Sequence, residues 1–140
     1  VHKNGLESLD SLSGEAKRFL PPLPIKYDPE VKCYADMMKM QGMGGHVNEN
    51  FPKAQAIKDA TMAHFIMQNW SEGKLLIHYN GSYHSNNFEG IIWHIRQDYP
   101  DLNILSIANV MQEDVKELEE KNMSLASYIL SVPTTMTRTR

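Results

Sequence analysis

The residues best suited to chemistry in this sequence lie in one short stretch, HYNGSYH at residues 78–84. Its two histidines and two tyrosines, His78, Tyr79, Tyr83 and His84, offer imidazole nitrogens and phenol oxygens, which are ligands for transition metals and haem iron. We expect the stretch to leave a parallel strand and enter a helix. In open α/β sheets, binding sites form beyond the carboxyl ends of such strands. His84 is therefore the first candidate, whereas His78 is equally consistent with a residue packed inside the sheet.

A second polar pair, Gln55 and Asp59, has the spacing of one face of a helix, because residues four apart are neighbours there. A buried carboxylate on that face could orient a histidine or support a metal site. The alternative is a solvated polar face. His46 is a weaker candidate, since the glycines before it are not followed by the Lys and Ser/Thr of a phosphate-binding loop. No serine lies in a nucleophile-elbow pattern, so no Ser/His/Asp triad is indicated.

The elements that must position these residues differ between the two halves of the chain. Residues 1–72 predict helices and linkers: a short helix opened by Ser13, then helices over 30–41 and 52–71. Residues 73–140 predict alternating elements, with strands over 74–79, 103–108 and 127–132 and helices over 87–97 and 113–121. This alternation implies right-handed crossovers and a parallel sheet. The expected class is α/β, a partial parallel sheet with a βαβαβ C-terminal half, preceded by a helical cap subdomain.

Three apolar strands cannot cover one another well, so we expect something else to complete the sheet. The chain begins at Val1 without an initiator Met or a signal pattern, and an amphipathic stretch follows at once. We interpret it as part of a longer protein. The sheet would then be completed by a missing N-terminal half, by a second copy in a homodimer, or by both.

The composition excludes several classes of protein. The 140 residues are 41% hydrophobic and 22% charged, which is ordinary globular usage. A formal net charge of -3 gives no overall electrostatic attraction for nucleic acid. No apolar run approaches the roughly 18 residues of a membrane-spanning helix. The single cysteine, Cys33, excludes an internal disulfide and a zinc site built from cysteines.

Four segments together resemble the ChaN-like family of bacterial haem-binding proteins, within the wider haem-uptake and Tiki superfamily. They are PIKYD at 24–28, FPKAQAIKDATMA at 51–63, HYNGSYH at 78–84 and YILSVP at 128–133. The middle two carry most of the resemblance. The resemblance covers nearly the whole chain, which looks like the C-terminal half of a family member.

The resemblance implies more than the residues alone. Members of this family are typically exported lipoproteins of the bacterial envelope, and one binds haem between two subunits in iron acquisition. The superfamily also includes metal-dependent proteases with two Gly-x-x-His motifs, of which residues 81–84 match one. The second would belong to the missing half. The helical half would cap the sheet, with Gln55 and Asp59 facing the site.

Three hypotheses follow for function. In the first, the protein binds haem for iron acquisition at the envelope, with Tyr79, Tyr83, His84 or His46 as iron ligand. In the second, it is a metal-dependent hydrolase in which His84, together with a His and a Glu from the missing half, holds a divalent metal that activates water. His78 is a further candidate ligand, and Asp59 acts as an outer orienting group. In the third, it is an α/β domain without a ligand. A binding protein is favoured over an enzyme.

Overall fold

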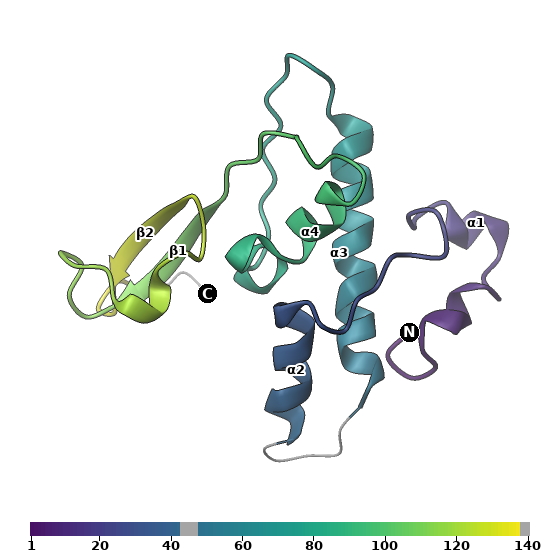
Figure 1. Ribbon diagram of the computed structural model, residues 1–140, viewed down its shortest axis with the longest axis horizontal. Coiled ribbons are helices and arrows are strands. Elements are labelled where there is room, and N and C mark those ends of the chain that lie inside the picture. Colours follow the sequence, from purple (N-terminus) through teal and green to yellow (C-terminus); the bar gives the residue numbers. More distant parts are fainter. Residues whose placement is uncertain (43–47, 138–140) are drawn as a thin grey trace.

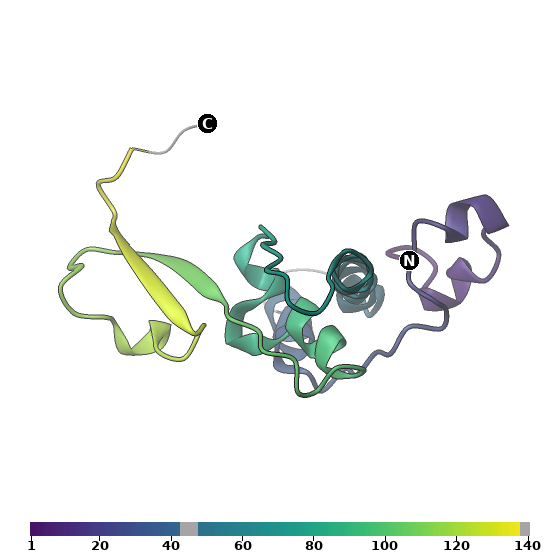
Figure 2. The same cartoon turned by 90° about the horizontal axis from the view of Figure 1, so that it is seen from above.

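The computed structural model describes residues 1–42 and 48–137, and it is built around one long helix. This helix, α3 (Asn50–Asn69), contacts α2 (Lys32–Gly42) and α4 (Ile91–Arg96). A small sheet lies at one end of the molecule and the short α1 (Gly14–Lys17) lies at the other, as Figure 1 shows. The view from above in Figure 2, along α3, shows the same order from sheet to N-terminus.

The helices predicted for the first half are confirmed. The 3-10 helix Leu6–Leu9 precedes α1, and the Ser13 hydroxyl caps α1 by accepting the backbone N–H of Ala16 at 3.2 Å. The helices predicted over 30–41 and 52–71 correspond to α2 and α3, with bounds that differ by one or two residues. The proline-rich segment between α1 and α2 is extended or turned, because prolines and the residues before them leave the helical region.

The two ends of α3 are fixed by side chains outside it. The Asn48 side-chain oxygen accepts the backbone N–H of Asn50 at 3.0 Å, which satisfies one of the donors that a helix start leaves free. At the other end Trp70 is extended, and its indole N–H donates to the Lys74 carbonyl oxygen at 2.9 Å. The helix is therefore held at a defined length of 20 residues.

The apolar core lies between α3 and α4. Ala63, Ile91 and Ile95 form its buried centre. Further apolar side chains that pack against this centre are Met62, Ile66, Met67, Leu102 and Ile104. The apolar face of α4 consists of Ile91, Ile92 and Ile95, which are buried.

The sheet consists of two parallel strands, β1 (Ile107–Gln112) and β2 (Tyr128–Pro133), with Ile107 opposite Tyr128. Ser106 and Ser127, just before the strands, fix this register, since each hydroxyl accepts the other residue's backbone N–H at 3.1 and 3.2 Å. Parallel pairing is confirmed, and β2 lies one residue from its predicted position. β1 begins four residues later than the predicted 103–108. Mixed helices with a two-stranded parallel sheet are compatible with the α/β class.

Other elements predicted for the second half are wrong in this structure. Residues 74–79 form no strand: Leu75 is 87% exposed and Tyr79 91%, and no described segment pairs with them. An apolar alternating run becomes a strand only where another strand supplies its hydrogen bonds. Residues 113–121 form no α-helix either. The side-chain amide of Gln112 donates to the carbonyls of Asp114 and Glu117 and holds this segment as a loop, which ends in the 3-10 helix Glu120–Asn122.

The helix predicted over 87–97 is shorter, because its first residues adopt positive φ angles. Asn87 and Phe88 have φ of 58° and 60°, and Gly90 has φ of 55°. This backbone forms two 3-10 turns, Ser82–His84 and Asn86–Phe88, before α4 begins. Asn87 therefore belongs to a turn that precedes α4. The division of the chain at residue 72 into two regions remains a prediction.

Candidate functional site

The structure brings Gln55, Asp59 and His84 together although 29 residues separate the first from the last. α3 supplies Gln55 and Asp59 from adjacent turns, and the 3-10 turn Ser82–His84 supplies the histidine. His84 Nδ1 lies 2.5 Å from Asp59 Oδ1 and 2.8 Å from the Gln55 amide nitrogen. We call these three residues with Tyr34 the His84 cluster.

Asp59 is the centre of the cluster, and the protein encloses it completely. Its side chain is 0% exposed, and its second oxygen, Oδ2, accepts the Tyr34 hydroxyl at 2.9 Å. Burial raises the pKa of Asp59, while the hydrogen bonds from His84 and Tyr34 act in the opposite direction. The alternative of a solvated polar face on α3 is thus wrong at Asp59.

The short contact with Asp59 decides which nitrogen of His84 carries the proton. A carboxylate only accepts, so Nδ1 must be the donor toward Asp59. The same nitrogen then cannot accept from Gln55, but the Gln55 amide nitrogen also lies 3.4 Å from His84 Nε2, and its N–H can donate to that atom in this tautomer. In neutral His84 the other nitrogen, Nε2, keeps its lone pair. The His84 side chain is 22% exposed, so the ring that carries this lone pair lies at the protein surface.

Tyr34 continues the hydrogen bonds away from His84 to a second histidine. Its ring is fully buried, and its hydroxyl oxygen lies 3.3 Å from His94 Nε2. Because the single Tyr34 proton goes to Asp59, His94 Nε2 must donate to the Tyr34 oxygen. Burial, and to a smaller degree the charge of Lys26, lowers the pKa of His94 to about 4, so this imidazole is neutral at pH 7.

Two residues beside α4 complete the support of the cluster. A side chain at Gly90 would put a Cβ atom 2.5 Å from the His84 carbonyl oxygen and 3.3 Å from Asp59 Oδ2. Only glycine lets the backbone pass this close. The Glu89 carboxylate accepts the backbone N–H of Cys33 at 2.7 Å and so ties the start of α2 to this turn. Burial, followed by the Glu89 charge, raises the pKa of the Cys33 thiol to about 12.

The remaining candidates from the sequence lie outside this cluster. Tyr79 and Tyr83 are exposed, and so is His78, which is not a residue packed inside a sheet. His46 lies outside the described residues. In the described part of the chain, no three His, Cys, Asp or Glu side chains gather closely enough to hold a metal ion.

Tyr34, His94, Glu89 and Gly90 were not predicted from the sequence as members of the site. Tyr34 and His94 stand alone in helices without a motif, and only the packing of α2 and α4 on α3 brings them to Asp59. One signal was available for Gly90, since a glycine directly before the apolar helix run Ile91–Ile92 marks a special backbone position.

A protein family model described as "Haem-binding uptake, Tiki superfamily, ChaN" matches residues 1–95, which include the whole His84 cluster. The chain therefore belongs to this family of haem-binding uptake proteins. No curated protein and no solved structure matches the chain significantly. Of the helices in the described residues, none has both the length and the apolar character that crossing a bilayer requires.

Proposed function

We propose that the protein binds haem and that His84 Nε2 is the ligand to the haem iron. The observation that carries this proposal is the 2.5 Å contact between His84 Nδ1 and the buried Asp59, in a chain of the haem-binding uptake family. Histidines that ligate metals in proteins usually donate their other N–H to a carboxylate or carbonyl, which fixes the ring and strengthens the ligand. The pair Asp59–His84 has this arrangement.

The donors present in the structure fit haem iron. An imidazole is a common axial ligand, and a tyrosine phenolate is another. Tyr79 and Tyr83 are exposed and lie close to His84 in the sequence, so each is a candidate for a second ligand or for an aromatic surface against the porphyrin. Gln55 is close enough to His84 to help orient its ring. When bound, haem would supply an iron centre with redox and ligand-binding chemistry, while the protein would supply the ligand and its orientation.

The test is a titration of the protein with haemin, followed by the Soret band. We expect saturable binding by the wild type and loss of the shifted band in His84→Ala. Asp59→Asn should weaken binding by about 10- to 100-fold, the usual effect of removing the partner of a ligating histidine. His2→Ala is the matched control, because His2 is an exposed imidazole that packs against Phe51 and takes no part in the His84 cluster.

The variants Tyr79→Phe and Tyr83→Phe assign the second ligand in the same titration. If the Soret shift survives in His84→Ala but is lost in Tyr83→Phe, the phenolate is the ligand and our assignment of His84 is wrong. If the wild type shows no saturable binding, haem binding itself is wrong. The samples would then be analysed for a divalent metal and assayed for peptidase activity, the alternative in which His84 and His78 belong to a metal site.

We propose further that haem binding serves haem or iron acquisition at the bacterial envelope, where the chain would be an exported protein or lipoprotein. This is supported by the uptake function in the family description. We also propose that a second copy, or a further part of the same protein, completes the sheet as a larger parallel sheet. The support is the apolar surface that β1, β2 and residues 74–79 leave exposed.

A further inference from the structure

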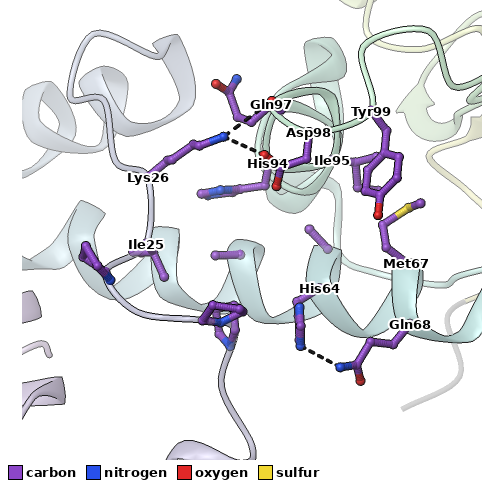
Figure 3. A pocket seen from close by; sticks show the side chains of 15 residues that line it. Ile25, Lys26, His64, Met67, Gln68, His94, Ile95, Gln97, Asp98 and Tyr99 are labelled. Atoms are coloured by element: carbon purple, nitrogen blue, oxygen red, sulfur yellow. Dashed lines mark hydrogen bonds and ion pairs between the residues drawn. The ribbon is translucent and has the colours of Figure 1, made fainter.

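A cavity of about 420 Å³ lies on another side of α3 from His84, between the extended segment 21–26, α3 and α4. Figure 3 shows the side chains around it. None of Gln55, Asp59, Tyr34 and His84 lines it, so it is separate from the His84 cluster. We call it the Lys26 cavity. Its volume falls within the range of roughly 300–1,000 Å³ that is typical of small-molecule sites.

Most of the wall of the Lys26 cavity is apolar. Ala60, Ala63 and Met67 of α3 form one side, Ile95 of α4 a second, and Ile25 with three prolines the third. Ala60, Ala63 and Ile95 are almost fully buried, so this wall belongs to the core and is rigid. Prolines make the third side stiff as well. Such a wall favours an apolar molecule and gives it a preformed shape.

One end of the Lys26 cavity carries an ion pair, formed by Lys26 and Asp98. Lys26 Nζ donates to Asp98 Oδ1 at 2.7 Å and to the Gln97 carbonyl at 3.4 Å, and its third N–H has no partner among the described residues. Figure 3 shows the ammonium group above the ring of His94, with Asp98 and Gln97 at the same end of the cavity. The lowered pKa of His94 is consistent with a positive potential from Lys26.

We propose that the Lys26 cavity is a second binding site, and that it takes a small amphipathic monocarboxylate. The carboxylate is held by the free N–H of Lys26 beside His94, and the apolar body lies along Ala60, Ala63, Met67 and Ile95. Asp98 competes with the ligand for Lys26. It is exposed, and an exposed ion pair is weak enough to yield to a better-placed carboxylate.

The test uses octanoate as probe and octan-1-ol as its neutral counterpart, in an NMR titration of the ¹⁵N-labelled protein. We expect octanoate to shift the amide signals of Ala60, Ala63 and Ile95 at lower concentration than octan-1-ol does. Lys26→Gln should weaken the binding of octanoate about tenfold, which corresponds to the loss of one charge-assisted hydrogen bond, and should leave the binding of octan-1-ol unchanged. Asp98→Asn should have the opposite effect and tighten the binding of octanoate, because it removes the carboxylate that competes for Lys26.

The matched control is Lys39→Gln, since Lys39 is an exposed lysine that also pairs with an aspartate, the half-buried Asp36, but lies on α2 away from the cavity. The proposal is overturned if octanoate and octan-1-ol bind equally, or if Lys26→Gln and Lys39→Gln have the same effect. It is also overturned if the shifted signals lie outside the cavity wall. Because Lys26 and Asp98 are at the surface, both variants are expected to fold. Neither readout depends on haem, so the two proposals fail separately.

Discussion

At the scale of single residues, the protons of four buried or half-buried side chains have one consistent arrangement. Asp59 accepts from His84 on one oxygen and from Tyr34 on the other, and Tyr34 in turn accepts from His94. Each donor has a single proton at the atom concerned, so reversing one bond would require the whole series to rearrange. The arrangement requires an N–H on His94 Nε2 but no positive charge. Burial in the same place disfavours that charge.

The lowered pKa of His94 makes a prediction for stability against pH. Unfolded His94 takes up a proton near pH 6.5, while the folded residue resists it until about pH 4. Its contribution is therefore fully present above pH 6.5 and is lost as the pH falls toward 4. The expected loss is on the order of 3 kcal/mol in the free energy of unfolding. The raised pKa of Asp59 acts in the opposite direction. Folded Asp59 takes up its proton at a higher pH than the unfolded residue does, so this group favours the folded state as the pH falls.

The comparison that isolates His94 is wild type against His94→Gln, which keeps an N–H for Tyr34 and retains Asp59. We expect urea unfolding to show a higher free energy of unfolding for the wild type than for His94→Gln at pH 7.5. This difference should shrink progressively between pH 6.5 and pH 4. Two profiles that stay parallel over this range would show that His94 is not held neutral by the fold.

Some of the cluster could be predicted from sequence and some could not. The spacing of Gln55 and Asp59 on one helix and the Gly-x-x-His pattern at residues 81–84 are local signals, and the structure joins them in one place. Tyr34 and His94 have no local signal. A buried tyrosine and a core histidine have the same sequence appearance whether or not they meet a carboxylate, so only tertiary packing identifies them.

At the scale of elements, the turn before α4 depends on one residue without a side chain. Gly90 has φ of 55°, and a Cβ there would be 2.5 Å from the backbone oxygen of His84. Backbone atoms cannot move aside as the end of a flexible side chain can. The turn that carries His84 and the helix that follows it therefore pack against Asp59 only with glycine at this position.

Replacing Gly90 by Ala should consequently lower the free energy of unfolding, by about 3 kcal/mol from the positive φ and the steric overlap together. The control is Gly14→Ala in α1, where an added Cβ meets nothing within 4 Å. That change should leave stability unchanged or raise it, by at most about 1 kcal/mol. Thermal unfolding followed by circular dichroism measures both. Equal effects of the two substitutions would contradict the role of Gly90.

Helices and strands were predictable from the sequence where the pattern that determines them lies within the element itself. Long amphipathic or proline-bounded helices such as α2 and α3 were found within a few residues. Residues 74–79 have a strand-like sequence, but a strand also needs a neighbour, and sequence pattern does not report whether one is present. The segment 113–121 has helical charge spacing, yet the side chain of Gln112 satisfies the backbone carbonyls of Asp114 and Glu117 in a loop.

At the scale of the whole molecule, one face of the two-stranded sheet is uncovered. Ile107 is 65% exposed, and Tyr128 and Leu130 on the adjacent strand are also exposed. In the parallel register Ile107 lies opposite Tyr128, so these side chains form a continuous apolar surface. Exposed apolar surface of this kind, next to unpaired strand edges, favours association.

We expect the protein to self-associate with rising concentration, through this sheet face. Sedimentation velocity should show the weight-average mass increasing, and Ile107→Lys should weaken the association at least about tenfold, because a buried isoleucine contributes roughly 2 kcal/mol. Ser11→Lys adds the same charge at the opposite end of the molecule and should have no such effect. A wild-type mass that does not change with concentration would argue instead for completion by a further part of the same protein.

The position of the two sites around α3 has a consequence for engineering the protein. Asp59 faces His84, while the next residue, Ala60, and Ala63 one turn later face the Lys26 cavity. The sites are thus divided around the circumference of one helix and overlap along its length. Shortening α3 or replacing it as a unit would therefore disrupt both proposed binding sites together. A single substitution on one side of α3 would alter one proposed site and leave the other intact, so the two sites can be tested and engineered separately within the same twenty residues.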